Sequence, residues 1–150
     1  MVEPSRSGYG CFRQGMNRER PLRVLLVDDD ADVLVMLQAV LTSRSLDVVG
    51  LATSGADAEK VAAAIAPDVA VVDYMMPGMT GLETAARIKA LRPQCVVIIF
   101  SALPELAAVA EEHPAVDRFV PKSDILALDA LLNEMREARH VSDRPGNGPE

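Results

Sequence analysis

Five short apolar runs, each followed by a helix-like pattern, constrain most strongly what this chain can fold into. The runs are rich in β-branched residues and lie at 22–27, 48–52, 69–73, 96–100 and 118–120. Between them, apolar residues recur with helical spacing, as at Val33, Leu34, Leu37 and Leu41. Continuous apolar strands that alternate with helices are typical of a parallel sheet covered on both faces. We therefore expect an α/β fold with a five-stranded parallel sheet between helices.

Capping residues and prolines predict where these helices begin and end. Ser54 stands at an N-cap position, and Pro67 ends the helix that follows it. Pro93 closes a helix over about 82–91, and Pro104 suits the first turn of a short helix that ends before Pro114. A final helix is marked by the spacing of Ile125, Leu128, Leu132 and Met135.

The length and composition predict one globular domain with unstructured ends. Of 150 residues, 49% are hydrophobic, which suffices for a core. We expect a flexible N-terminal arm at 1–20, a folded domain at 21–139 and a disordered tail at 140–150, too short for a second domain. Met16 is a plausible alternative start. No run approaches the roughly 20 apolar residues of a membrane span, and no signal peptide is recognisable, so we expect a cytoplasmic protein without membrane insertion.

Charge and cysteine content exclude several classes of protein. The net charge of −7 opposes nonspecific attraction to phosphate backbones, and the chain has no Trp, so we expect no direct nucleic-acid binding. Cys11 and Cys95 have no spacing typical of a metal knuckle or a disulfide framework. We expect both to be free thiols, with Cys95 in the core.

Polar residues follow four of the five predicted strands. Asp28 and Asp29 follow the first strand, Asp73 ends the third, Ser101 the fourth, and Lys122 follows the fifth. Because the carboxyl ends of parallel strands share one edge, we expect these side chains to meet. Neighbouring carboxylates repel by about 4 kcal/mol per pair at an effective dielectric constant of 20, so a cation must offset them. Mg²⁺ prefers such oxygen ligands and bridges to phosphate.

The same residues suit transfer of a phosphoryl group. The charge on its equatorial oxygens would be met by Mg²⁺, by the Lys122 ammonium and by the Ser101 hydroxyl with backbone N–H groups. Asp73 would be the nucleophile and would form an acyl phosphate. Each residue alone has a simpler explanation, such as a turn or a solvated lysine, and for Asp30 we favour helix capping. Their conjunction at the ends of four strands favours the phosphoryl site.

Four motifs together resemble the receiver domain of bacterial response regulators: Val-Asp-Asp-Asp at 27–30, Asp73 with Met-Pro-Gly-Met-Thr-Gly at 76–81, Phe-Ser-Ala at 100–102 and Val-Pro-Lys at 120–122. The resemblance covers about residues 22–138. It implies a flavodoxin-like sheet of order 2-1-3-4-5. It also implies the following roles: Asp73 as phospho-acceptor and Mg²⁺ ligand, Asp29 as a direct ligand, Asp28 acting mainly through metal-bound water, the Met75 backbone carbonyl as a further ligand, Ser101 and Lys122 binding phosphoryl oxygens, and Ser101 and Phe119 as a switch pair.

Some positions depart from the commonest pattern of the family. Ser101 replaces the frequent Thr, and Phe119 replaces the frequent Tyr, so a switch here lacks a hydroxyl. Ser123 follows Lys122 where many relatives have Pro, which argues against a cis peptide bond there. Met75 is apolar where polar side chains often contact attacking water, so dephosphorylation rates cannot be transferred from relatives.

The resemblance implies a signalling protein rather than an enzyme acting on other substrates. We expect a stand-alone response regulator, or an intermediate in a phosphorelay, that catalyses only its own phosphorylation and dephosphorylation. Its donor would be a histidine kinase or a histidine phosphotransfer protein. It would signal to a downstream protein, or form a homodimer, through the surface of helix 4, strand 5 and helix 5, at about 104–139.

Three alternatives have specific sequence signatures. A pseudo-receiver that binds a partner without phosphorylation would usually lack an acid, the acceptor or the lysine, all of which are present. A metal-dependent phosphohydrolase normally has a second Asp two residues after its nucleophile, where this chain has Met75. A flavin-binding module needs a hydroxyl-rich phosphate loop after the first strand, which the acidic triplet contradicts.

Overall fold

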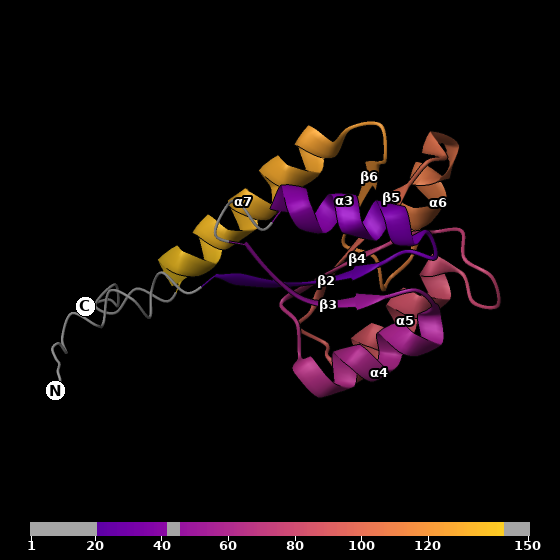
Figure 1. Cartoon of the computed structure of the whole chain (residues 1–150), viewed down its shortest axis with the longest axis horizontal. Helices are drawn as coiled ribbons and strands as arrows, with labels where there is room; N and C mark the ends of the chain where they lie inside the picture. Colours follow the sequence, from indigo (N-terminus) through magenta and orange to yellow (C-terminus); the bar gives the residue numbers. More distant parts are fainter. Residues whose placement is uncertain (1–20, 42–45, 143–150) are drawn as a thin grey trace, which may run out of the picture.

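A computed structural model of the chain describes residues 21–41 and 46–142, with side chains up to residue 138. Strands and helices alternate along it in the expected order (Figure 1). The strands are β2 (Leu22–Val27), β3 (Leu46–Ala52), β4 (Val69–Val72), β5 (Val96–Ser101) and β6 (Arg118–Pro121). The helices are α3 (Ala31–Leu41), α4 (Gly55–Ile65), α5 (Gly81–Leu91), the 3-10 turn η2 (Pro104–Leu106), α6 (Ala107–Glu112) and α7 (Ile125–Ser142).

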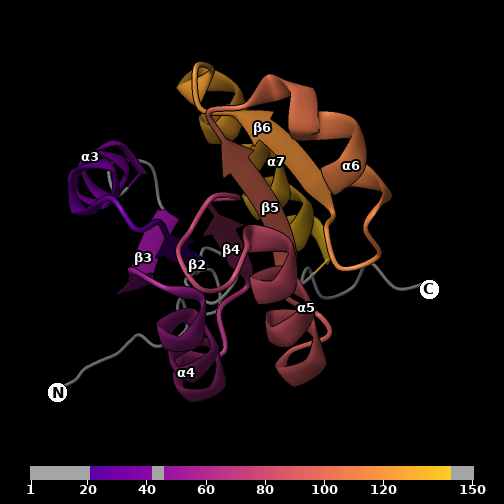
Figure 2. The same ribbon diagram turned by 90° about the vertical axis from the view of Figure 1, so that its right-hand side faces the viewer.

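The five strands form one parallel sheet in the order β3-β2-β4-β5-β6. Numbered along the chain, this is the order 2-1-3-4-5, so the predicted fold class is confirmed. Figure 2 shows the sheet from β3 at one edge to β6 at the other. Because β2 and β4 are neighbours, the loops that follow them lie side by side at the carboxyl edge of the sheet.

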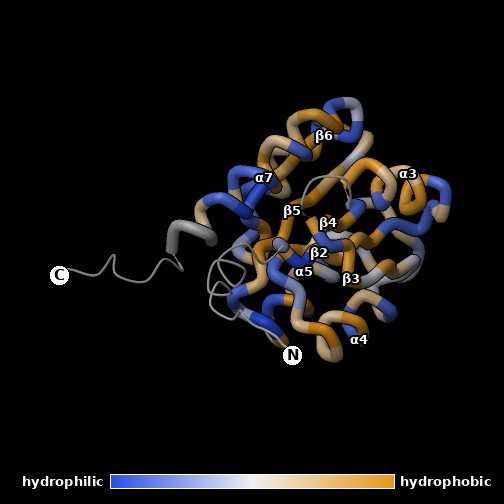
Figure 3. The backbone as a smooth tube through the Cα atoms, turned by 60° about the vertical axis from the view of Figure 1, so that its left-hand side comes forward, coloured by the Kyte–Doolittle hydropathy of each residue, from blue (hydrophilic) through white to orange (hydrophobic). Residues whose placement is uncertain are grey.

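Each face of the sheet buries its own apolar cluster, as expected for a doubly covered parallel sheet. In Figure 1, α3 and α7 lie above the sheet, while α4 and α5 lie below it. The upper cluster joins the strands to Leu34 and Leu37 of α3 and to Leu128 and Leu132 of α7. The lower cluster contains small helical residues of α4, α5 and α6, among them Ala58, Ala62, Ala85 and Ala110, together with Ile88. In Figure 3, orange, apolar backbone runs along β5 inside the sheet, while α3, α4 and α7 carry both orange and blue residues.

The start of α4 and the start of η2 follow the sequence expectation, and α5 begins with a cap that was not predicted. The Ser54 side chain accepts a hydrogen bond from the Asp57 N–H and caps α4, which ends at Ala66 in a left-handed conformation just before Pro67. Thr80 and Glu83 form a reciprocal capping box at the start of α5. Pro104 lies in the first turn of η2, as expected.

Several boundaries differ from the sequence expectation. The strand expected at 48–52 begins at Leu46, because Asp47 is an exposed residue of an edge strand that interrupts the apolar run. The third strand ends at Val72 rather than Asp73, and α7 continues beyond 139 to Ser142. Cys95 is a buried free thiol, as predicted, and burial raises its pKa to about 12. Residues 1–20, with Cys11 and Met16, and 143–150 lie outside the described residues.

Candidate functional site: an acidic pocket at the carboxyl edge of the sheet

Backbone hydrogen bonds between neighbouring loops place the two buried aspartates side by side. The N–H of Asp28, just after β2, donates to the carbonyl of Ala52 at 3.0 Å. The N–H of Asp73, just after β4, donates to the carbonyl of Val27 at 2.9 Å. Because β2 and β4 pair in parallel register up to Val27 and Val72, the next residue of each strand enters the same pocket. Asp28 is 2% exposed and Asp73 is 6% exposed.

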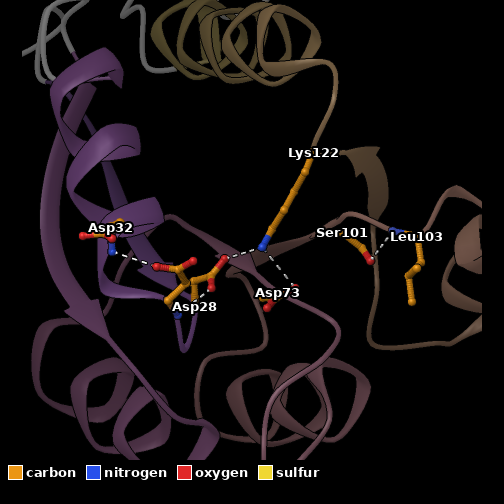
Figure 4. Close-up of polar contacts among 7 residues, drawn as sticks. Asp28, Asp32, Asp73, Ser101, Leu103 and Lys122 are labelled. Carbon is orange, nitrogen blue, oxygen red and sulfur yellow. Dashed lines mark hydrogen bonds and ion pairs between the residues drawn. The ribbon is translucent and has the colours of Figure 1, made fainter.

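Lys122 directly follows the edge strand β6, and its side chain reaches both carboxylates (Figure 4). Its Nζ lies 2.6 Å from Oδ2 of Asp28 and 3.5 Å from Oδ1 of Asp73. Its backbone N–H donates to the carbonyl of Ser101 at 2.7 Å, which fixes the start of this loop against the end of β5. The ammonium is therefore the internal countercharge that the sequence predicted for this edge.

The third carboxylate, Asp29, stands at the rim of the pocket. It is exposed, in contrast to Asp28 and Asp73. One oxygen from each of these three residues lies within 4.8 Å of the others, close enough to share a metal ion. The remaining oxygen of Asp28, Oδ1, accepts the N–H of Asp30 at 2.8 Å. Asp30 in turn accepts the N–H of Asp32 at 2.9 Å at the start of α3, the capping role predicted for it.

The electrostatic state of the pocket follows from burial and from the proximity of like charges. Burial, with a further contribution from the charge of Asp28, raises the pKa of Asp73 to about 6. Lys122 and a hydrogen bond from the Met75 backbone N–H oppose that shift. Burial acts to lower the pKa of Lys122, but its hydrogen bond to Asp28 and the charge of Asp73 leave that pKa above the ordinary value. Lys122 is therefore charged at neutral pH, and Asp73 carries a proton more readily than an ordinary aspartate.

The expected switch residues occupy the β5 and β6 side of this edge. Ser101 is fully buried, and its hydroxyl accepts the N–H of Leu103 at 3.1 Å (Figure 4). Phe119 is half-buried and packs against the apolar cluster on the α4, α5 and α6 side of the sheet. In register, Phe119 pairs with Ile99 of the neighbouring strand. The ring therefore lies on the strand next to the one that Ser101 ends.

Three further features of the loops around the pocket bear on the sequence analysis. Met75, two residues after Asp73, is 57% exposed. The described residues contain no cis peptide bond, which agrees with the absence of Pro after Lys122. The sequence predicts no contact for Gly81, whose N–H donates to the Tyr74 carbonyl at 2.8 Å beside Asp73.

The donor set fits a hard divalent cation. Three carboxylates within reach of one point, two of them buried, leave a negative excess that the single Lys122 ammonium does not neutralise. Oxygen ligands of this type suit Mg²⁺, which uses one or two carboxylates and retains water. An ammonium beside a buried carboxylate also suits an incoming phosphoryl group.

Comparison with known proteins agrees with this geometry. The model of the response regulator receiver domain family matches residues 24–133. The chain therefore belongs to the response regulator receiver domain family. Receiver domains are signalling phospho-acceptors. None of the helices in the described part of the chain is long and apolar enough to cross a membrane.

Individual relatives include proteins of bacterial chemotaxis. The chain is 35% identical to chemotaxis protein CheY of Thermotoga maritima over 115 residues, covering 73% of this chain and 96% of that protein. It is 34% identical to a protein-glutamate methylesterase/protein-glutamine glutaminase of Halalkalibacterium halodurans over 137 residues, or 85% of this chain. The chain spans only 40% of the length of that methylesterase.

A solved structure shows the same fold. The response regulator TrrA of Thermotoga maritima, solved in complex with Mg²⁺ and BeF, superimposes with a TM-score of 0.66 at 26% identity. The match covers 77% of this chain and 96% of TrrA.

Proposed function

We propose that this chain accepts a phosphoryl group on Asp73 from a histidine kinase or a histidine phosphotransfer protein in a Mg²⁺-dependent reaction. The observation that carries the proposal is the single ammonium of Lys122, placed between the buried carboxylates of Asp28 and Asp73 with Asp29 at the rim. A structural ion pair needs one acid. Here one lysine faces two buried acids, and a third acid lies close enough to share a metal ion. The negative charge of this site is balanced only when a further cation binds, alone or together with a phosphoryl group.

The chemistry assigned to each group follows from its position. A carboxylate oxygen of Asp73 attacks phosphorus, forming a P–O bond as the P–N bond to the donor histidine breaks, and the imidazole takes up a proton. Lys122 moves its positive charge toward a phosphoryl oxygen, and Ser101 offers its hydroxyl to another. Mg²⁺, held by Asp28, Asp29 and Asp73 with the Met75 backbone carbonyl, would supply the countercharge that lets phosphoryl oxygens approach three carboxylates.

The proposed output is a change in protein contacts. Ser101 and Phe119 lie at the end of β5 and on β6, next to α6 and α7. A phosphoryl group that recruits the Ser101 hydroxyl would break its hydrogen bond with the Leu103 N–H. The segment leading into η2 and α6 then loses one of its anchors, and the half-buried Phe119 ring can repack. We place the partner surface on α6, β6 and α7, and this surface would serve a downstream protein or a second copy.

The decisive experiment is intact-mass measurement after incubation with acetyl phosphate and Mg²⁺, and separately with a phosphorylated histidine donor. Wild type is expected to gain one phosphoryl group, and Asp73→Asn none. A wild-type chain that gains no mass from either donor would favour the alternative of a pseudo-receiver that binds its partner without phosphorylation.

A second measurement tests the assigned role of Lys122. In Lys122→Ala we expect the phosphoryl group still to attach to Asp73, while the phosphorylation-dependent change in partner affinity shrinks. The partner would be obtained by a pull-down that compares phosphoryl-loaded with unloaded protein. An unchanged response of the partner to phosphorylation would contradict the role of Lys122 as the sensor of the phosphoryl charge.

A further inference from the structure

A backbone hydrogen bond from Gly81 closes the loop that follows Asp73. The N–H of Gly81, the first residue of α5, donates to the carbonyl of Tyr74 at 2.8 Å. The other side of Asp73 is held by its own N–H, which donates to the carbonyl of Val27. The phospho-acceptor therefore lies between two backbone anchors, one on the neighbouring strand and one on the helix that follows.

The second anchor requires a very close backbone approach. A Cβ atom on Gly81 would clash with the carbonyl oxygen of Asp73 and would lie 2.8 Å from the Cα of Tyr74 and 3.0 Å from the carbonyl carbon of Asp73. All three are backbone atoms, which cannot rotate away as a side chain can. Gly78 is the only described glycine with a positive φ angle, so Gly81 is required for space and not for its backbone conformation.

Another tightly packed glycine meets a different kind of neighbour. A Cβ atom on Gly50 would lie 2.7 Å from Cγ1 of Val61 and 3.0 Å from Cδ1 of Ile65. These atoms belong to side chains of α4, and the β-branched Val61 has little rotamer freedom in a helix. An alanine at Gly50 therefore forces side chains of α4 to shift and lowers stability, but it does not meet the backbone of Asp73 or Tyr74.

We propose that Gly81 is a positioning residue for the phospho-acceptor. By allowing α5 to touch the backbone of Asp73 and Tyr74, it sets the distance of the Asp73 carboxylate from Asp28 and Lys122. This inference rests on the proposed function of Asp73. A methyl group at Gly81 displaces the Asp73 peptide from the metal and phosphoryl positions, although Asp28, Asp29, Asp73 and Lys122 are all still present.

The test compares Gly81→Ala with Gly50→Ala in the full chain. For each variant, the dissociation constant for Mg²⁺ is measured by titration calorimetry, the phosphorylation rate with acetyl phosphate at saturating Mg²⁺ by intact mass, and thermal stability by circular dichroism. We expect Gly81→Ala to weaken Mg²⁺ binding and to slow phosphorylation by about tenfold or more, and Gly50→Ala to stay within about twofold of wild type at comparable or lower stability. A purely structural role would change both variants in proportion to stability.

Two results would overturn the inference: near-wild-type Mg²⁺ binding and phosphorylation in Gly81→Ala, or parallel losses in both variants. Should Gly81→Ala not fold, the amide spectrum of wild type decides instead. The Gly81 N–H resonance is expected to shift together with that of Asp73 as Mg²⁺ is added, while that of Gly50 stays in place, and a stationary Gly81 resonance would refute the positioning role. Failure of the proposed function has a different signature, because wild type itself would then bind no Mg²⁺ and accept no phosphoryl group.

Discussion

Lys122 and Asp28 are 94 positions apart in the chain, yet Nζ of the lysine lies 2.6 Å from Oδ2 of the aspartate. The aspartate side chain is 3% exposed and the lysine side chain 22%. The same Nζ lies 3.5 Å from Oδ1 of Asp73, so one ammonium serves two buried carboxylates. The same ammonium therefore stabilises the folded state and sets the charge of the pocket.

Replacing Lys122 by Met should destabilise the metal-free protein by about 2–4 kcal/mol, because it leaves the buried carboxylate of Asp28 without its cation. The raised pKa of Lys122 means that its contribution is fully present at neutral pH and is lost only as the pH rises through that pKa. Urea unfolding in EDTA measures the effect. Added Mg²⁺ should restore part of the lost stability, and a variant as stable as wild type in EDTA would contradict the ion pair.

Lys89→Met is the matched control for this experiment. Nζ of Lys89 lies 2.7 Å from Oδ2 of Asp117, and the lysine side chain is 23% exposed, as at Lys122. Asp117, however, is 40% exposed and also accepts the N–H of Val97. Its carboxylate is therefore solvated after the substitution, and the loss should stay within about 1 kcal/mol.

Asp73→Asn should stabilise the metal-free fold at neutral pH while abolishing phosphorylation. Burial and the charge of Asp28 raise the pKa of Asp73 from 3.8 to about 6, so the ionised form disfavours folding. At 1.36 kcal/mol per pKa unit, removing that charge should contribute about 1–3 kcal/mol. The gain should be fully present above about pH 6 and should shrink toward zero as the pH falls below about 4, where Asp73 becomes protonated in both states.

Urea titrations of wild type and Asp73→Asn in EDTA across this pH range test whether the substitution stabilises the fold. Asp47→Asn serves as the control, because Asp47 is exposed on the edge strand β3 and its substitution should leave stability within about 0.5 kcal/mol. Should Asp73→Asn be less stable than wild type at neutral pH, the electrostatic strain assigned to the pocket would be wrong.

Mg²⁺ should raise the melting temperature of wild type and have little effect on Asp29→Asn. A ligand present at 100 times its dissociation constant stabilises the folded state by about 2.7 kcal/mol. Because Asp29 is exposed, its substitution should hardly change stability in EDTA. A smaller Mg²⁺ effect in this variant would then reflect the loss of a metal ligand and not misfolding. Asp32→Asn, which changes an exposed acid in the first turn of α3 outside the triad, should keep the full Mg²⁺ effect. Equal Mg²⁺ shifts in wild type and Asp29→Asn would remove Asp29 from the metal site.

The thiol of Cys95 should be inert in the folded protein. Burial raises its pKa to about 12, so almost none is present as the reactive thiolate at neutral pH. In a Cys11→Ser background, alkylation by iodoacetamide should be at least about a hundredfold slower in buffer than in denaturant. Comparable rates in the two conditions would show that the lower apolar cluster opens readily.

The sequence predicted the strands and helices that have strong local signals. The apolar runs of β2, β4 and β5 lie within one residue of the expected bounds, and Ser54 caps α4 and Pro104 begins η2 as expected. The start of β3 was missed, because an edge strand exposes alternate residues and Asp47 interrupts its apolar run. The apolar spacing marked α7 only as far as Met135, because helical periodicity weakens in the polar segment that continues the helix to Ser142.

For the pocket, the residue types were predictable but the contacts were not. Acids, a hydroxyl and a lysine at strand ends are visible in the sequence, and the parallel sheet predicts that they share an edge. The choice of Asp28, rather than Asp29, as the partner of Lys122 depends on which side chain turns inward after β2. The close approach of Gly81 to the Asp73 backbone has no sequence signal beyond the glycine itself.

By itself, the sequence determined the alternation of apolar strands and helices, the helix ends and the set of reactive groups, because these depend on side chains near one another in the chain. Only the tertiary structure decided which groups are buried, which share the ammonium of Lys122 and how the pKa of Asp73 responds. Burial and the distances between charges depend on the three-dimensional arrangement of the chain. Residues as far apart in the sequence as Asp28 and Lys122 come into contact only when the sheet forms.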